Sequence, residues 1–145
     1  MYRPPRNAPD GQQQRWFDLV SCQFAFHYCF ESEAQAHCMI RNAAECLKPG
    51  GFFFGTTPCA RTILSRVNKA YSETTGSGKA KFGNSVYSVE FEEESNVAQK
   101  LREKGEVSLE DLPAFGNQYN FHLEGVVDCP EFLVNFKVQW IYSVT

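Results

Sequence analysis

Two short segments of the chain carry aromatic and hydrogen-bonding side chains that could bind a flat ligand together. Residues 23–28 have the sequence Gln-Phe-Ala-Phe-His-Tyr, and residues 56–58 have the sequence Thr-Thr-Pro. A site for a planar heterocycle needs apolar walls and a few polar groups that fix its orientation. The two segments therefore favour a heterocycle-binding site. The alternative is that Phe24, Phe26 and Tyr28 are ordinary core residues, because large aromatic side chains are usually buried.

Each of these segments follows a predicted strand. Residues 16–24 form a nearly continuous apolar run, which is typical of a strand buried on both faces of a parallel sheet. Residues 51–57 form a second such run. Ligands of open α/β sheets bind outside the carboxyl ends of the strands. We therefore expect the two polar and aromatic segments to meet at one edge of a sheet.

A helix is predicted between the two strands. Ser32 is a candidate N-cap with Gln35 three positions later, which is the pattern of a capping box. Apolar residues then recur along one helical face at Ala36, Ile40, Ala43 and Leu47. The Pro-Gly-Gly of residues 49–51 is expected to end the helix. Strand, helix and strand would make one βαβ unit with a right-handed connection.

The second half of the chain predicts a different architecture. An amphipathic helix is indicated by Ile63, Leu64, Val67 and Tyr71. Residues 74–79 have the composition of a linker. Alternating apolar and polar residues at 85–91 and 119–123 predict strands of a small antiparallel addition.

Two further segments are expected to lie outside the core. Residues 1–15 are rich in Pro, Gln and Arg and predict a flexible lead-in, so the domain is expected over residues 16–145. Residues 92–112 are dense in Glu, Lys and Ser. We expect that second segment to be a solvated insertion rather than a further layer of core.

Composition excludes several classes of function. The chain has 145 residues, 43% of them hydrophobic, and a net charge of −3, which suits one globular domain without general attraction to phosphate. Its six cysteines include no C-x-x-C pair and no secretory signal precedes them, so we expect reduced thiols in an intracellular protein. No apolar run approaches the roughly 20 residues of a membrane span, so no membrane role is expected. His27, His37 and His122 lack zinc-site spacing, so no metal is expected.

Longer motifs resemble the messenger-RNA cap (guanine-N7) methyltransferases. The similarity extends from about Trp16 to Phe136, apart from the 92–112 region. The segments that carry it are Phe-Asp-Leu-Val-Ser-Cys-Gln-Phe, His-Tyr, Pro-Gly-Gly-Phe-Phe-Phe-Gly-Thr-Thr-Pro, Phe-Gly-Asn and Leu-Glu-Gly-Val-Val-Asp-Cys-Pro-Glu-Phe-Leu. The resemblance implies an α/β fold: part of a Rossmann-like class I methyltransferase sheet with a small antiparallel addition.

The resemblance also implies a cofactor site and a substrate site. Gln23 and Tyr28 match residues that line the S-adenosylmethionine site of the family, and Phe24 would be a neighbouring wall residue. His27 and Glu131 match residues that face the cap guanine, and Pro58 and Phe115 would be walls of the same pocket. Tyr119 and Phe121 are expected to be structural.

The implied reaction needs no catalytic acid or base. Guanine N7 can attack the methyl group of a sulfonium directly, and in-line positioning then supplies the rate. His27 would be a hydrogen-bonding positioner, although it could instead be a buried histidine that satisfies backbone groups. Glu131 could accept from guanine N1–H and N2–H together, which adenine does not offer. The alternative for Glu131 is the first turn of a helix that Asp128 caps and Pro130 opens.

By resemblance, the function is methyl transfer from S-adenosylmethionine to N7 of the mRNA 5′ cap guanine, in the nucleus. The expected partners are the capped mRNA 5′ end (GpppN) and an activating subunit or the transcription machinery. The family's glycine-rich cofactor loop and its C-terminal strands do not occur among the 145 residues, so we expect a partial methyltransferase domain. The alternative is an inactive truncated fragment that acts at most as a binding or interaction module.

Overall fold

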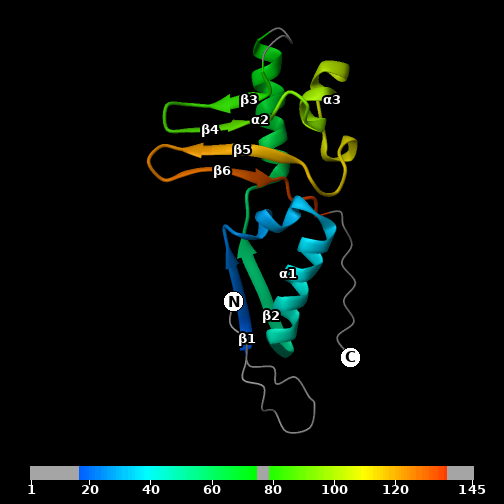
Figure 1. The fold of residues 1–145 in the computed structure, drawn as a ribbon, viewed down its shortest axis with the longest axis vertical. Coiled ribbons are helices and arrows are strands. Elements are labelled where there is room, and N and C mark those ends of the chain that lie inside the picture. Colours follow the sequence, from blue (N-terminus) through cyan, green and yellow to red (C-terminus); the bar gives the residue numbers. More distant parts are fainter. Residues whose placement is uncertain (1–16, 75–78, 137–145) are drawn as a thin grey trace.

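A computed structural model describes residues 17–74 and 79–136 of the chain. These residues form an α/β structure with a two-stranded parallel sheet and a four-stranded antiparallel sheet (Figure 1). This agrees with the fold class expected from the sequence. The predicted lead-in at residues 1–15 and the centre of the predicted linker, residues 75–78, lie outside the described residues.

The parallel sheet pairs β1 (Phe17–Gln23) with β2 (Leu47–Thr56), and α1 (Glu33–Cys46) connects them. The predicted strand, helix and strand are therefore confirmed. Ser32 caps α1 as expected, because its hydroxyl accepts from the Gln35 backbone N–H at 3.3 Å. The helix ends at Cys46, earlier than the Pro-Gly-Gly at residues 49–51 suggests. That tripeptide lies inside β2, so the predicted end of the helix was wrong.

One face of this sheet is not buried by the described residues. The helix α1 contacts both strands, and its buried residues Ala36 and Ala43 belong to the predicted apolar face. Four apolar side chains of the strands are nevertheless exposed, namely Phe17, Leu19, Phe52 and Phe54. The expectation of burial on both faces is therefore wrong for the described residues, because nothing among them covers the face that these side chains occupy.

The antiparallel sheet has the order β3-β4-β5-β6, so each strand pairs with its neighbour in sequence. Its strands are β3 (Lys81–Gly83), β4 (Tyr87–Glu90), β5 (Gln118–Leu123) and β6 (Val127–Phe132). The helix α2 (Ala60–Glu73) contributes the predicted apolar residues Ile63, Leu64, Val67 and Tyr71 to the core beside this sheet. Both the helix and the antiparallel addition predicted from the sequence are confirmed.

The solvated insertion expected at residues 92–112 is instead part of this core. The segment contains α3 (Asn96–Lys104), which Ser95 caps through the Ala98 backbone N–H. Gly105 ends the helix with a φ of 78°, a left-handed conformation that glycine adopts without strain. Six apolar side chains of the segment are buried in the core cluster, namely Val97, Ala98, Leu101, Val107, Leu109 and Leu112. The charged residues that suggested solvation lie partly on α3 and partly in the segments before and after it. Because they outnumber the apolar residues, the composition of the segment did not reveal its buried positions.

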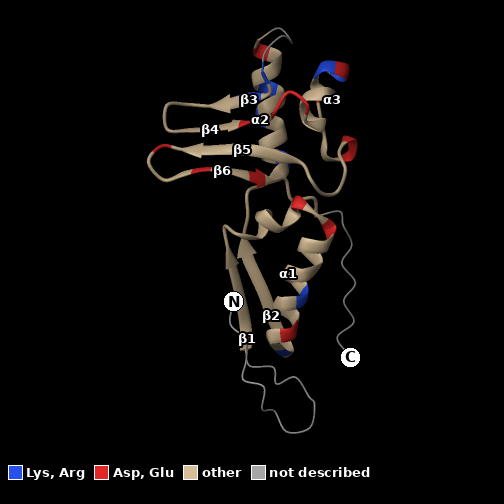
Figure 2. Ribbon diagram, in the orientation of Figure 1, with Lys and Arg blue, Asp and Glu red and all other residues tan. Residues whose placement is uncertain are grey.

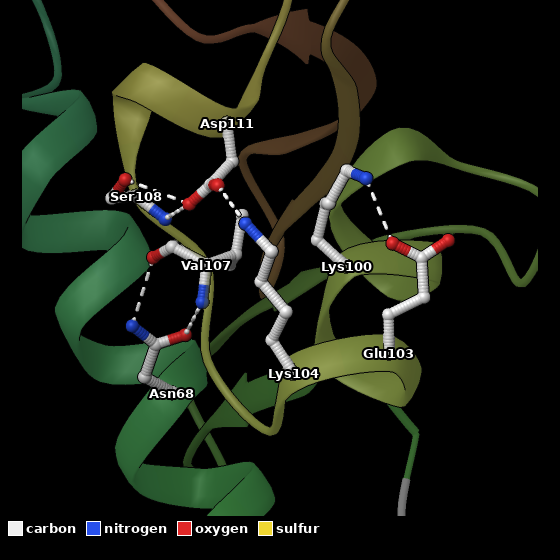
Figure 3. A network of polar contacts seen from close by, with 7 residues as sticks. All are labelled: Asn68, Lys100, Glu103, Lys104, Val107, Ser108 and Asp111. Carbon is white, nitrogen blue, oxygen red and sulfur yellow. Dashed lines mark hydrogen bonds and ion pairs between the residues drawn. The ribbon is translucent and has the colours of Figure 1, made fainter.

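Polar contacts also hold this segment in place (Figure 3). The side-chain amide of Asn68 on α2 donates to the Val107 carbonyl at 2.9 Å, and its Oδ1 accepts from the Val107 N–H at 3.0 Å. After Val107, Asp111 accepts from the Ser108 hydroxyl and from the Lys104 ammonium group. These contacts fix the backbone that leaves α3 against the side of α2, and from there the chain continues to the short helix η2 (Leu109–Asp111).

Three features of the described residues bear on the classes of function considered above. No helix among them is long and apolar enough to cross a membrane. The described parts of the chain hold no group of three metal-ligating side chains. All six cysteines fall within the described ranges, and none forms a disulfide.

Candidate functional site

The carboxyl ends of β1 and β2 meet, as the sequence predicts. Gln23 and Thr56 are register partners at the end of the parallel pair. The Thr56 hydroxyl donates to Gln23 Oε1 at 2.7 Å, while the Gln23 amide donates to the Ser21 hydroxyl at 2.8 Å. The Phe24 backbone N–H then donates to the Thr56 carbonyl at 2.9 Å. The two segments that could bind a heterocycle are thus joined directly.

Phe24 is the most unusual residue at this edge. Its φ is 50°, the only positive value among the described residues other than glycine. Its side chain is 69% exposed, so the alternative that it is a core aromatic is wrong. A bulky residue in the left-handed region is a genuine outlier, and such strain is concentrated at functional sites. By contrast, Phe26 packs edge-on against Phe30 and Phe53 and is a core residue.

The short 3₁₀ helix η1 (Phe26–Glu31) follows at once and positions His27. The imidazole is 2% exposed, and its Nε2 lies 3.3 Å from Oε1 of Glu131. That approach lacks the angle of a hydrogen bond, and neither ring nitrogen has a hydrogen-bond partner among the described residues. The alternative of a histidine that satisfies backbone groups is therefore wrong. His27 has unused hydrogen-bonding capacity beside a carboxylate.

Glu131 lies on β6 rather than in the first turn of a helix, so the capping alternative is also wrong. Asp128 and Pro130 belong to the same strand, and β6 pairs with β5 along its whole length. This pairing places Tyr119 directly opposite Glu131. The tyrosine hydroxyl donates to Glu131 Oε2 at 2.7 Å, and the carboxylate is only 5% exposed.

The neighbours of Glu131 control its ionisation. Burial acts to raise the pKa of its carboxyl, but the adjacent His27 imidazole and the hydrogen bond from Tyr119 outweigh burial and hold that pKa below its usual value. Burial and the bond to Glu131 raise the pKa of Tyr119 far above its ordinary range. At neutral pH the pair is therefore a carboxylate beside a protonated phenol. Such an arrangement keeps Glu131 an acceptor of hydrogen bonds.

Tyr28 forms the outer part of the same cluster. Its ring lies 4.3 Å from the His27 ring between centroids, and its hydroxyl lies 3.4 Å from Cys129 Sγ. The contact with Cys129, together with partial burial, raises the pKa of the Tyr28 hydroxyl to about 12. The side chain is 41% exposed, so a ligand at the strand ends could contact it.

The two predicted wall residues are placed differently. The Phe115 ring packs against Phe30 of η1 with centroids 5.5 Å apart, and the next residue, Gly116, donates its N–H to the Phe30 carbonyl at 2.9 Å. The loop before β5 is thereby attached to η1. Pro58 is half-buried just beyond β2, next to Thr57, whose buried hydroxyl has no hydrogen-bond partner in the described part of the chain.

Sequence reasoning missed two members of this cluster, Tyr119 and Cys129. Tyr119 was expected to be only structural, yet it contributes to the core and also donates to Glu131. The signal that could have found it is the hairpin itself. Tyr119–Leu123 and Val127–Glu131 flank a three-residue turn, and antiparallel pairing about that turn sets Tyr119 against Glu131.

A cleft in the described part of the chain lies away from this cluster. A cleft of about 410 Å³ is lined by Tyr71, Phe91, the acidic residues 92–94 and Arg102, among others, and by none of the predicted site residues. The chemistry of the buried cluster, rather than the size of a hollow, therefore identifies the candidate site. Figure 2 shows acidic residues on β6 and the β5–β6 turn, whereas Lys and Arg are spread over the helices and also occur on β2 and β3.

Comparisons with known proteins point to one family. Residues 6–141 match the family model described as the mRNA (guanine-N(7))-methyltransferase domain. The chain is 57% identical over 119 residues to the mRNA cap guanine-N(7) methyltransferase of Drosophila melanogaster, an alignment that covers 82% of this chain and 23% of the relative. It is 42% identical over 125 residues to mRNA cap guanine-N(7) methyltransferase 1 of Oryza sativa subsp. japonica, which covers 84% and 29% respectively. The chain thus spans about a quarter of the length of these relatives.

Proposed function

Because this chain belongs to the mRNA (guanine-N(7))-methyltransferase domain family, we propose that it provides the guanine side of an enzyme that methylates N7 of the mRNA cap. The observation that carries the proposal is the buried cluster in which Glu131 Oε1 lies 3.3 Å from His27 Nε2 and Oε2 accepts from Tyr119 at 2.7 Å. A buried, ionised carboxylate suits recognition of a planar base with several donors, and the adjacent histidine has no hydrogen-bond partner among residues 17–74 and 79–136.

On the guanine side, Glu131 would read the identity of the base. Each carboxylate oxygen can accept about two hydrogen bonds, so contacts with His27 and Tyr119 leave acceptor capacity for a ligand. Guanine offers N1–H and N2–H side by side, and adenine has no such pair of donors. A good bidentate pair discriminates by about 1–3 kcal/mol. His27 would hold the base in place, with Pro58 and Phe115 as walls.

The proposed chemistry is positioning rather than proton transfer. Guanine N7 carries a lone pair and no proton, so its attack on a methyl group needs no base. Holding N7, the methyl carbon and the leaving sulfur in line is worth up to about 7–11 kcal/mol. No residue of this chain is therefore assigned as a general acid or base. A carboxylate near the ring would also stabilise the positive charge that methylation creates.

On the cofactor side, the proposed methyl donor is S-adenosylmethionine, whose sulfonium supplies an activated methyl group. The residues at the carboxyl ends of β1 and β2 fit one edge of such a molecule. Phe24 offers an exposed ring on a backbone with a positive φ, which is unfavourable for a bulky residue. Tyr28 offers a partly exposed ring. Gln23 would orient a polar group of the cofactor, and its amide is already held by Ser21 and Thr56.

The proposed partner is the capped 5′ end of a transcript (GpppN) in the nucleus, with an activating subunit or the transcription machinery as a second partner. A net charge of −3 supplies no general attraction to RNA. Recognition by this chain would therefore depend on specific contacts with the cap guanine. A tagged protein that accumulates outside the nucleus would contradict the nuclear part of the proposal.

Isothermal titration of the 145-residue chain with GpppG, ApppA and S-adenosylmethionine tests the proposal. We expect GpppG to bind about 5- to 150-fold more tightly than ApppA, and Glu131→Ala to abolish that preference. Gln23→Ala should weaken S-adenosylmethionine binding selectively. Glu124→Ala, in the exposed β5–β6 turn, and the exposed Gln99→Ala are matched controls.

Equal affinity for GpppG and ApppA would contradict guanine recognition by Glu131. No saturable binding of either cap analogue by a folded chain would show that these residues do not form a guanine site in this chain. Binding that survives Glu131→Ala would move the site away from the buried cluster.

A further inference from the structure

Tyr119 makes a contact that its role in the core does not require. Its ring is buried in the core cluster, where it lies 5.8 Å from the Phe91 ring between centroids. Its hydroxyl extends out of that cluster and donates to Glu131 Oε2 at 2.7 Å. The two residues are register partners on β5 and β6, so the backbone holds both ends of this contact.

The hydrogen bond from Tyr119 restrains the terminal side-chain torsion of Glu131, which would otherwise vary over a broad range. The terminal torsion of a glutamate is broad and roughly two-fold, so a carboxylate with one partner can rotate freely. The Tyr119 hydroxyl bonds to Oε2 of Glu131, and the His27 ring lies near Oε1. Tyr119 belongs to β5, whereas His27 belongs to η1. The hydrogen bond from Tyr119 at Oε2, with the His27 ring close to Oε1, restricts the plane of the carboxylate. A bidentate contact with a flat base requires such a defined plane.

We propose that Tyr119 is a positioning residue for guanine recognition, which fixes the plane of the Glu131 carboxylate and keeps it an acceptor. This inference rests on the proposed function, because it assigns the role of Glu131 to guanine. Tyr119 itself need not touch the base. Its ring stays in the core, and its effect on the ligand passes through one hydrogen bond.

A purely structural role is the competing explanation. Buried tyrosine hydroxyls usually find a partner, and a carboxylate is a convenient one. The two explanations differ in what happens when only the hydroxyl is removed. A structural tyrosine would change stability alone, whereas a positioning tyrosine would also change how Glu131 titrates and how tightly guanine binds.

The test compares Tyr119→Phe with Tyr71→Phe in the full 145-residue chain. Tyr71 is a buried tyrosine of the same core cluster, on α2, so it controls for removal of the hydroxyl from a core tyrosine. The first readout needs no ligand: the pH titration of the Glu131 carboxyl carbon by nuclear magnetic resonance. The second is GpppG affinity as a function of pH, and thermal unfolding verifies that each variant is folded.

We expect Tyr119→Phe to raise the pKa of Glu131, because the carboxylate loses a donor that favours its ionised form. GpppG affinity should fall about 10-fold, and its loss at acid pH should begin at a higher pH than in the wild type. S-adenosylmethionine affinity should stay unchanged. Tyr71→Phe should leave the Glu131 titration and GpppG affinity at wild-type values.

A second variant keeps the inference falsifiable. In a Glu131→Gln background, Tyr119→Phe should cause no further loss of GpppG affinity, since the tyrosine acts through the carboxylate. Additive losses would overturn the inference, as would wild-type GpppG affinity in Tyr119→Phe. A wild-type chain that binds no GpppG would overturn the proposed function, and the Glu131 titration would still decide whether Tyr119 controls the carboxylate.

Discussion

Nε2 of His27 lies 3.3 Å from Oε1 of Glu131 in the interior of the protein. The histidine belongs to η1, which follows the parallel sheet, and the glutamate belongs to β6 of the antiparallel sheet. The pair therefore connects the two sheets at the carboxyl ends of β1 and β2, as the arrangement in Figure 1 illustrates. Any ligand that uses both side chains would contact both η1 and the antiparallel sheet.

Coupling between these residues can be measured by a double-mutant cycle. His27→Gln and Glu131→Gln should each lower the free energy of unfolding by about 1–3 kcal/mol, because each change weakens a buried polar contact. The double variant should lose less than the sum, with a coupling of about 1 kcal/mol or more. Urea unfolding at neutral pH provides the measurement. Strictly additive losses would mean that the 3.3 Å approach carries no energy.

The pH dependence of stability should report the ionisation of Glu131. Burial acts to raise the pKa of this carboxyl, but the adjacent His27 imidazole and the hydrogen bond from Tyr119 lower it below its ordinary value in the folded protein. The unfolded chain then binds the proton more readily, so Glu131 stabilises the fold above the usual glutamate pKa of about 4.3. This stability is lost as the pH falls through the folded-state pKa.

Unfolding of the wild type and Glu131→Gln at a series of pH values checks this sign. The difference in unfolding free energy between the two should be largest near neutral pH and should shrink as the solution becomes acidic. Glu124→Gln, at an exposed position of the β5–β6 turn, should follow the wild-type curve. A difference that grows at acid pH would contradict a lowered Glu131 pKa.

Phe24 should matter for binding and not for folding. Its ring is 69% exposed and its φ is 50°, so Phe24→Ala should change the unfolding free energy by less than about 0.5 kcal/mol. The same change should weaken S-adenosylmethionine binding by about 10-fold if the ring stacks on the ligand. Phe26→Ala is the contrasting variant, because its ring packs on Phe30 and Phe53 and its loss should destabilise the fold. Unchanged affinity in folded Phe24→Ala would remove this residue from the site.

The core role of α3 can be tested by truncating one side chain. Leu101 is 1% exposed, so Leu101→Ala should lower the unfolding free energy by about 2–5 kcal/mol through lost burial and a residual cavity. Gln99→Ala, at an exposed position of the same helix, should cost less than about 0.5 kcal/mol. Equal, small effects of both changes would mean that residues 92–112 are a solvated insertion after all.

Local sequence patterns predicted best those elements whose formation depends on residues that are close in the sequence. The Ser32 cap and the apolar spacing of α2 needed only neighbouring side chains, and both are confirmed. The end of α1 was predicted too late, because β2 pairs with β1 from Leu47 and that pairing competes with the helix. The 92–112 segment was misjudged because charged residues outnumber the apolar ones that reach the core.

For the candidate site too, sequence spacing predicted some of the contacts and only strand pairing decided the others. Spacing along the chain was enough to predict that Gln23 and Thr56 meet, because parallel strands end at the same edge of a sheet. It could not predict that Glu131 lies in a strand, since Asp128 and Pro130 also suit the start of a helix. Only pairing of β6 with β5 decides between the two.

The sequence by itself determined the family, the strand-helix-strand unit of β1, α1 and β2, the helix α2, the strands β4 and β5, and the residue types available for binding a flat base. The tertiary structure decided how those residues are grouped. It buried Glu131 between His27 and Tyr119, and it left Phe24 exposed. The physical reason is that a carboxylate's ionisation and orientation depend on burial and on donors from distant parts of the chain. Such contacts exist only after both sheets have formed and packed together.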